Sequence, residues 1–232
     1  SASQTFHLNA SAQLGGILVG TENVTQILKL ITNHVDINGS LYVDKNSTFN
    51  ANGYNVNIAG NLFSYYSGGF VADGTGQITT FDGTTMQTIS GNNGTTNISF
   101  SNLTISNPTT TQLSVGKATV NNLLTISRGA LDDGGNTITV KGNVVNDSRH
   151  ISSVGGGSLT FNGNGEQEMA SSSGRSGTYG NIVIKERVEL KNPIVITGRV
   201  TLNNDIYAND FQVSLMQNSI FDNASTGMII VN

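Results

Sequence analysis

Two neighbouring aspartates are the first candidates for a cation site. Asp132 and Asp133 stand directly before a Gly-Gly-Asn stretch at 134–136, and carboxylate and amide oxygens are the ligands that calcium prefers. The same composition is also typical of a structural turn, because Asp, Asn and Gly readily adopt the backbone angles of turns. A related stretch at 50–53 reads Asn-Ala-Asn-Gly and has no carboxylate, which favours the structural interpretation.

An aromatic pair is the candidate for ligand binding. Tyr65 and Tyr66 lie between two serines in a Gly-containing stretch. Exposed aromatic rings can stack on the flat apolar faces of sugar rings. The alternative is that both rings only pack within their loop.

The remaining charged positions indicate solvated surface. Glu166 and Glu168 are two residues apart and therefore share a face if they lie on a strand, and the segment 185–191 alternates in charge, as exposed strands often do. Three histidines, His7, His34 and His150, share no metal-ligand spacing. The sequence contains no nucleophile elbow, phosphate loop or zinc motif, so we expect no catalysis and no cofactor.

Composition restricts the elements that could position these residues. Of 232 residues only 11% are charged, whereas 28 are Gly, 30 are Asn and none is Cys. This composition is typical of strands and turns, and it excludes a helical bundle and disulfides. The net charge of −4 without a basic cluster gives no reason to expect nucleic acid as a partner. The sequence contains no run of about 18 apolar residues, the length that would predict a membrane-spanning helix.

The chain repeats itself. The stretch 49–62 recurs at 131–144 and in part at 206–215, and 78–89 recurs at 159–169. A phenylalanine precedes a matching strand by about 22 residues at Phe6, Phe81 and Phe161. We therefore divide one domain, 1–232, into units of about 77 residues. The divisions are a partial repeat at 5–33, repeats at 35–115 and 118–193, and a partial repeat at 194–232.

Short apolar-x-apolar triplets fill each repeat, and this alternation is the period of a β-strand. Strands of three to five residues that repeat along the whole chain favour a stack of coils over a sandwich. The sequence thus predicts an all-β, right-handed parallel β-helix (β-solenoid) of about ten coils. The segment 26–31 could instead be a short amphipathic helix, but its alignment with 103–105 favours a strand.

The repeated motifs resemble a known group of proteins. They are Gly-Ser-Leu-Tyr-Val at 39–43, Val-Asn-Ile-Ala-Gly-Asn at 56–61, Phe-Ser-Asn-Leu-Thr-Ile at 100–105 and Leu-Thr-Phe-Asn-Gly at 159–163. The pattern is similar to the repetitive β-solenoid stretches of secreted and surface proteins of Bacteroidota, the gliding and type IX secretion bacteria. It is less similar to filamentous-haemagglutinin-like adhesins. The resemblance implies a secreted or cell-surface location and a structural or adhesive role.

The ends of the chain suggest a specific form of that role. Residues 226–231 resemble 75–80, which directly precede Phe81, the equivalent of Phe6, so the ends match as successive parts of one repeat. Open solenoid ends expose strand edges, and head-to-tail stacking of such ends produces a filament. We therefore expect a non-catalytic structural or adhesive extracellular module. Its matching ends fit either a segment of a longer array, or a coincidence of boundaries, or a protomer that self-associates end to end. The alternative is a polysaccharide-binding or polysaccharide-degrading protein, such as the pectate-lyase-like β-helix enzymes.

Overall fold

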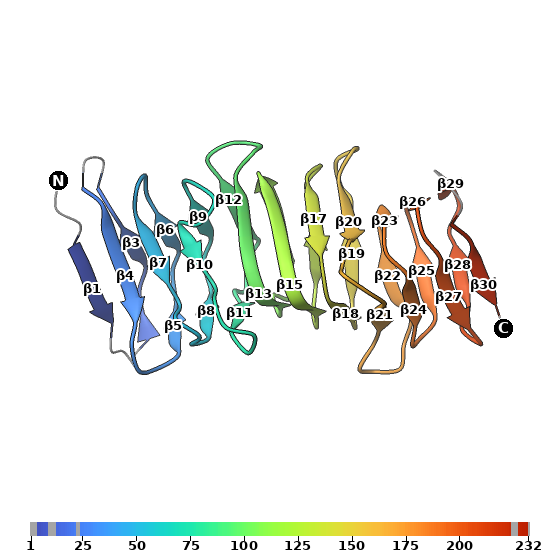
Figure 1. Ribbon diagram of the computed structural model, residues 1–232, viewed down its shortest axis with the longest axis horizontal. Helices are drawn as coiled ribbons and strands as arrows, with labels where there is room; N and C mark the ends of the chain where they lie inside the picture. Colours follow the sequence, from blue (N-terminus) through green and yellow to red (C-terminus); the bar gives the residue numbers. More distant parts are fainter. Residues whose placement is uncertain (1–3, 9–12, 22–23, 224–226, 232) are drawn as a thin grey trace.

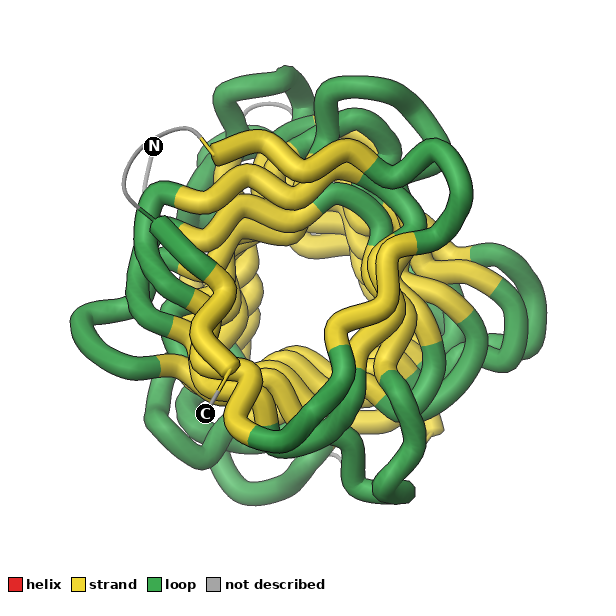
Figure 2. Tube along the Cα trace, turned by 90° about the vertical axis from the view of Figure 1, so that its right-hand side faces the viewer, coloured by secondary structure: helices red, strands yellow, loops and turns green. Residues whose placement is uncertain are grey.

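The chain forms a rod of stacked coils. The computed structural model describes residues 4–8, 13–21, 24–223 and 227–231, and the two termini lie at opposite ends of the long axis (Figure 1). Residue 226, part of the repeat at the C-terminal end, is outside the described residues. The described chain contains strands and turns and no helix. Seen along the rod, strands line three sides, and loops project at the corners between them (Figure 2).

The strands belong to a 20-stranded sheet, which bends into two faces, and a separate 10-stranded sheet. We call the three sides face A, face B and face C. Face A contains β1 (Gln4–Leu8), β4 (Gln26–Leu30), β7 (Thr48–Asn50), β10 (Phe70–Val71), β17 (Thr137–Val140), β20 (Ser158–Phe161), β23 (Ile182–Ile184), β26 (Arg199–Leu202) and β29 (Ile220–Asn223). Face B contains β2 (Gln13–Leu14), β5 (Val35–Ile37), β8 (Val56–Ile58), β11 (Ile78–Phe81), β18 (Asn143–Asn146), β21 (Gln167–Ala170), β24 (Val188–Leu190), β27 (Ile206–Asn209) and β30 (Ile229–Val231).

Two long strands, β13 (Asn97–Ile105) and β15 (Lys117–Ile126), run through the corner and contribute to both faces A and B. Face C is the 10-stranded sheet of β3 (Ile17–Val19), β6 (Leu41–Val43), β9 (Leu62–Ser64), β12 (Gln87–Gly91), β14 (Thr110–Val115), β16 (Ala130–Asp132), β19 (Arg149–Ile151), β22 (Gly177–Tyr179), β25 (Ile194–Ile196) and β28 (Val213–Leu215).

Strand pairing confirms the predicted stack. Every pairing between named strands in the described chain is parallel, which excludes the antiparallel sandwich. The spacing of about 22 residues is one coil, because Phe81 pairs with Ile105 and Phe161 with Ile184. The segment 26–30 is strand β4, so the helical alternative is wrong.

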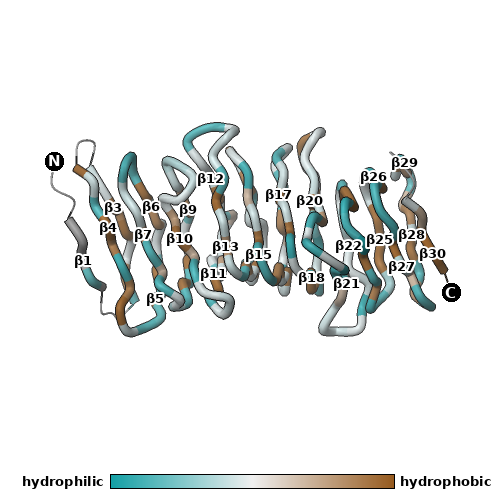
Figure 3. The backbone as a smooth tube through the Cα atoms, in the orientation of Figure 1, coloured by the Kyte–Doolittle hydropathy of each residue, from teal (hydrophilic) through white to brown (hydrophobic). Residues whose placement is uncertain are grey.

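The triplets form strands because every second side chain enters the rod. In β5, Val35 and Ile37 are buried and Asp36 faces outward. The same alternation of apolar and polar residues recurs along the rod (Figure 3). Inward residues of successive coils then stack into continuous apolar ladders, and their removal from water is the main stabilising term.

Phenylalanines pack in the centre of the N-terminal half. The rings of Phe49 and Phe70, one coil apart on face A, are parallel within 5° with centroids 5.9 Å apart. Phe100 continues the stack at 5.7 Å from Phe70 and meets Phe81 of face B edge-on at 6.4 Å. Edge-on and offset ring pairs are favourable geometries for aromatic packing, so these rings join two faces into one core.

The sequence repeat does not return to the same face. Its equivalent triplets are β8 at 56–58 on face B, β17 at 138–140 on face A and β28 at 213–215 on face C. Each repeat therefore ends one face short of a whole number of coils. Equivalent residues wind around the rod rather than lining one side.

Candidate functional site

The carboxylate of Asp132 is saturated by protein donors. Its Oδ1 accepts bonds from the Gly134 and Ser153 amides at 3.0 and 3.2 Å, and its Oδ2 accepts from Gln112 Nε2 and Ser153 Oγ at 2.8 and 2.5 Å. Burial alone would raise the pKa of Asp132, but these bonds outweigh it and hold the pKa below its usual value. The side chain is therefore an anion that fastens neighbouring coils.

Asp133 lies beside it in a fully buried polar cluster. Its Oδ1 accepts from the Gly135 amide at 3.0 Å, and its Oδ2 accepts from Ser152 Oγ. His150, also fully buried, places Nε2 3.3 Å from Asp133 Oδ2 and accepts the Gly180 amide on Nδ1. His150 Nε2 and Asp133 Oδ2 are within ion-pair distance, but they lack the alignment of a hydrogen bond.

The sequence did not indicate this pairing of His150 with Asp133. The cluster links β16, β19 and the end of β22, three successive strands of face C. Within the described ranges, no three His, Cys, Asp or Glu side chains are arranged to hold a metal ion. Because protein donors occupy the oxygens of Asp132 and Asp133, their geometry favours the structural interpretation of this turn.

A second charged cluster lies on the outside of face B. Arg187 Nε is 2.8 Å from Glu166, and Lys191 Nζ is 2.8 Å from Glu189 and 3.4 Å from Glu168. Glu168 and Glu189 are register partners on adjacent coils, so Lys191 offsets the repulsion between them. The structure thus brings the two carboxylates of 166–168 together with the alternating segment 185–191.

The pKa directions in this cluster suit fixed charges. Hydrogen bonding to Lys191 and to Asn209 lowers the pKa of Glu189, and hydrogen bonding to Glu189 raises the pKa of Lys191. Arg187 also lies over the Tyr207 ring, with Cζ 3.7 Å from the centroid. A general acid needs a raised carboxyl pKa and a lysine base needs a lowered one, whereas Glu189 and Lys191 shift the opposite way.

The two candidate tyrosines separate in space. Tyr66 is half-buried, and its hydroxyl lies 3.1 Å from Thr48 Oγ1 on the outside of face A. Tyr65 lies beside face C, where its backbone amide donates to the Val43 carbonyl of β6 at 2.9 Å. Within the described chain the two rings make no aromatic pair with each other.

Two other aromatic rings on face C stack on each other. Tyr42 and Phe63 are register partners on β6 and β9, with centroids 4.4 Å apart and planes within 12°. Rings stacked along the rod cover each other's flat faces. This pair is a cross-coil contact that sequence reasoning missed, although both residues occupy the outward position of an apolar-x-apolar or apolar-x-polar triplet.

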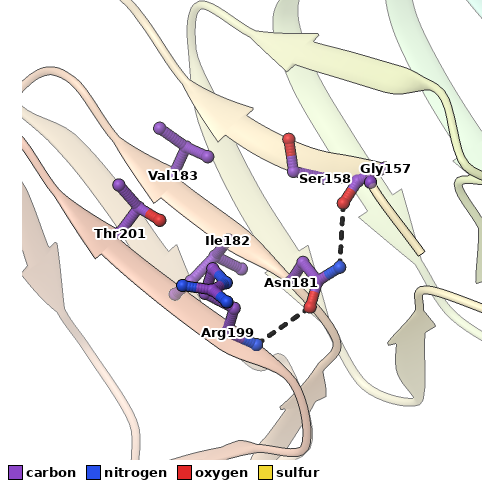
Figure 4. A pocket seen from close by; sticks show the side chains of 8 residues that line it. Gly157, Ser158, Asn181, Ile182, Val183, Arg199 and Thr201 are labelled. Atoms are coloured by element: carbon purple, nitrogen blue, oxygen red, sulfur yellow. Dashed lines mark hydrogen bonds between the residues drawn. The ribbon is translucent and has the colours of Figure 1, made fainter. Parts of the chain in front are cut away.

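A small hollow lies on the outside of β20, β23 and β26 (Figure 4). Its volume is about 170 Å³, and Asn181 forms its wall by bonding the Gly157 carbonyl and the Arg199 amide, each at 2.9 Å. The Arg199 guanidinium is paired with Asp222 at 3.1 Å. The polar groups of this hollow mostly satisfy one another.

Two buried glutamines that the sequence showed only as repeat positions have clear structural roles. Gln87 Oε1 accepts the Gly83 amide at 3.0 Å, and its Nε2 donates to the Ile58 and Gly60 carbonyls of the preceding coil at 2.8 and 2.5 Å. Gln167 makes the equivalent three bonds one repeat later, to the Gly163 amide and the carbonyls of 140 and 142. The shared Gly-x-x-x-Gln spacing at 83–87 and 163–167 was the available signal.

The C-terminal coil leaves apolar side chains exposed. In register, Leu215 continues the ladder of Ile196, and Phe221 that of Val200. Leu215 is nevertheless 49% exposed, Phe221 43% and Val231 71%. No further coil among the described residues covers β28, β29 and β30. We call these three strands the end surface.

Comparison with known proteins yields no match to a family model, a curated protein or a solved structure. The similarity to Bacteroidota surface repeats therefore stays a prediction. In the described chain no helix is long and apolar enough to cross a membrane.

Proposed function

We propose that this protein is a non-catalytic structural and adhesive module of an extracellular or surface rod. In this proposal the end surface binds the first coil of a second copy, so that modules join head to tail. The observation that carries the proposal is the exposed inward ladder of the last coil, in particular Leu215 and Phe221.

Two properties of the end surface support this partner. Its three strands present unpaired backbone groups on one side, and parallel strand edges of this kind are templates for another strand. Its exposed side chains are apolar, and covering them with another apolar ladder is favourable. A second coil of the same three-faced cross-section satisfies both requirements at once.

The surface chemistry favours this role over polysaccharide cleavage. The carboxylates of the cluster around Lys191 are paired with cations, and hydrogen bonding lowers the pKa of Glu189. Such groups are poor proton donors at neutral pH. Polysaccharide binding is the second candidate, and a hollow on the outside of face A beside β10 favours it.

Electron microscopy of the purified chain over a range of concentrations tests the proposal. We expect rods whose lengths are multiples of one unit, and more of the longer rods at higher concentration. Phe221→Glu should leave single units, because it places a charge in the proposed interface. Met86→Glu is the matched control, since Met86 is equally exposed but lies in a turn in the middle of the rod.

Single units at every concentration would overturn the proposal. So would end-to-end rods that Phe221→Glu does not shorten, or rods that associate only side by side. Circular dichroism of each variant establishes that its β-structure is intact before the lengths are compared.

A further inference from the structure

A second hollow lies on the outside of face A where one strand is shortened. β10 has two residues between the longer β7 and β13, and it pairs with β13 only through Val71 and Ser99. The gap leaves a volume of about 380 Å³. Besides the buried Phe70, it is lined by Ser67, Gly68, Val71, Ala72, Asn97 and Ser99, and we call it the β10 hollow. Ligand pockets typically measure about 300–1,000 Å³, so this one suits a ligand of one or two rings.

The polar groups of the β10 hollow keep unused hydrogen-bonding capacity. Ser67 Oγ accepts the Asn97 amide at 2.7 Å, which leaves its hydroxyl proton free to donate. Asn97 Oδ1 accepts from Thr119 at 3.1 Å, and its NH₂ group has no partner within the described chain. The Ser99 hydroxyl likewise has no partner there. The hollow therefore offers donors and acceptors at its wall and the apolar side chains of Val71 and Ala72 beside them.

The ring of Tyr66 is not part of this lining but lies next to Gly68, which is. The Tyr66 hydroxyl lies 3.1 Å from Thr48 Oγ1, which fixes the ring across the outside of face A. Its Cε2 lies 3.9 Å from the point that a Cβ on Gly68 would occupy. Gly68 has a φ of +101°, where side chains are strained, so this position keeps the space beside the ring open.

The lining carries no charged side chain. Lys117, the register partner of Asn97 on the next coil, and Asp73, which follows Ala72, lie outside it and have opposite signs. A wall of hydroxyl and amide groups with an apolar patch and a ring edge matches a neutral sugar, which has hydroxyls around its rim and C–H groups on its faces. An anionic uronic acid would find no fixed cation in the lining.

We propose that the β10 hollow binds a neutral pyranose unit of a polysaccharide. Ser67, Asn97 and Ser99 bind its hydroxyls, and Tyr66 and Val71 contact its apolar face. The site is independent of the end surface, because β10 lies in the N-terminal half of the rod and β28–β30 lie at its C-terminal end (Figure 1). Failure of one proposal therefore leaves the other standing.

NMR titration of the isotope-labelled full chain tests the proposal. The probes are the methyl pyranosides of glucose, galactose and mannose. The methyl pyranoside of galacturonic acid, with its carboxylate free and ionised, is the anionic comparison. We expect amide signals of residues 66–72 and 97–99 to shift, with dissociation constants on the order of millimolar, as befits a few net hydrogen bonds and one ring. At least one neutral sugar should bind more tightly than the galacturonate.

Two variants locate the binding. Ser99→Ala removes the free hydroxyl without adding bulk to the hollow, and we expect it to weaken binding about tenfold, equivalent to one hydrogen bond. Thr139→Val is the matched control, because Thr139 faces outward on the same face but outside the hollow. The proposal is wrong if no neutral sugar shifts these signals up to about 50 mM. It is also wrong if Ser99→Ala binds as well as Thr139→Val, or if the galacturonate binds best.

Discussion

Replacing Gln87 with leucine tests whether buried glutamines hold the coils together. The substitution removes the acceptor of the Gly83 amide, the donor to the Ile58 and Gly60 carbonyls, and an acceptor of Asn107 Nδ2 at 2.9 Å. The Gly83 amide is buried and is left without a partner. The Ile58 carbonyl keeps its bond from the Asp82 amide at 3.2 Å, so it is only partly unsatisfied.

The expected loss follows from these four contacts. A buried donor left unpaired costs about 1–3 kcal/mol, and each lost bond to a group with another partner costs about 0.5–1.5 kcal/mol. The leucine recovers about 1–2 kcal/mol because its side chain is buried. Gln87→Leu should therefore lower the free energy of unfolding by about 3 kcal/mol. Gln167→Leu should lose about 1 kcal/mol less, because Gln167 has no partner equivalent to Asn107.

Urea unfolding and amide hydrogen exchange measure the effect globally and locally. A solenoid can open coil by coil, so exchange of the Gly83 amide is the sharper readout, and it should accelerate about 100-fold if the opening energy falls by about 3 kcal/mol. Thr88→Val, at the outward neighbour of Gln87, is the control and should stay within about 0.5 kcal/mol of the parent. Equal stability of Gln87→Leu and Thr88→Val would refute the argument that these side chains bind the coils together.

Two further predictions concern titratable groups. Burial raises the pKa of Asp147, but the hydroxyls of Ser171 and Ser172 and the amide of Ser173 outweigh it and lower the pKa from 3.8 to about 2. Its stabilising effect is therefore full above about pH 4 and is lost as the pH falls toward 2. Asp147→Asn should lower the free energy of unfolding by up to about 1 kcal/mol at pH 7, allowing for solvent screening, and should have no effect near pH 2. Urea unfolding at each pH measures the difference. Lys191→Met should raise the pKa of Glu189, because it removes the hydrogen bond that lowers this pKa, and it should leave the unfolding midpoint almost unchanged. NMR titration of the Glu189 carboxyl carbon measures the pKa, and an unchanged low value would contradict the prediction.

The strands and their stacking were predictable from the sequence. Triplets such as 56–58 and 138–140 alternate apolar and polar residues, and this period requires one face inside and one outside. The spacing of about 22 residues from Phe81 to its matching strand is a local property of one coil, so it could be read without the structure. Both confirmed features depend on residue type and short separations along the chain.

The partners of polar groups were not predictable in the same way. Gln87 binds carbonyls 27 and 29 residues earlier in the sequence, and every residue supplies a carbonyl, so residue type identifies no partner. Asp133 meets His150 because consecutive coils bring their corners together, although the two side chains share no sequence motif. The interpretation of 132–136 as a structural turn was available from the sequence, but the buried histidine beside it was not.

Because successive repeats occupy different faces, the repeat restricts where on the rod a ligand-specific site can lie. All three faces accept the same inward ladders, which is why copies of one motif can occupy faces B, A and C in turn. A surface feature carried by every repeat would then wind around the rod and present no continuous side to a flat partner. Features that occur once, such as the Tyr66 loop and the cluster around Lys191, have a single fixed position on the rod. Selective recognition of a ligand is therefore expected at those unique features, and the repeated motifs are expected to stabilise the coil itself.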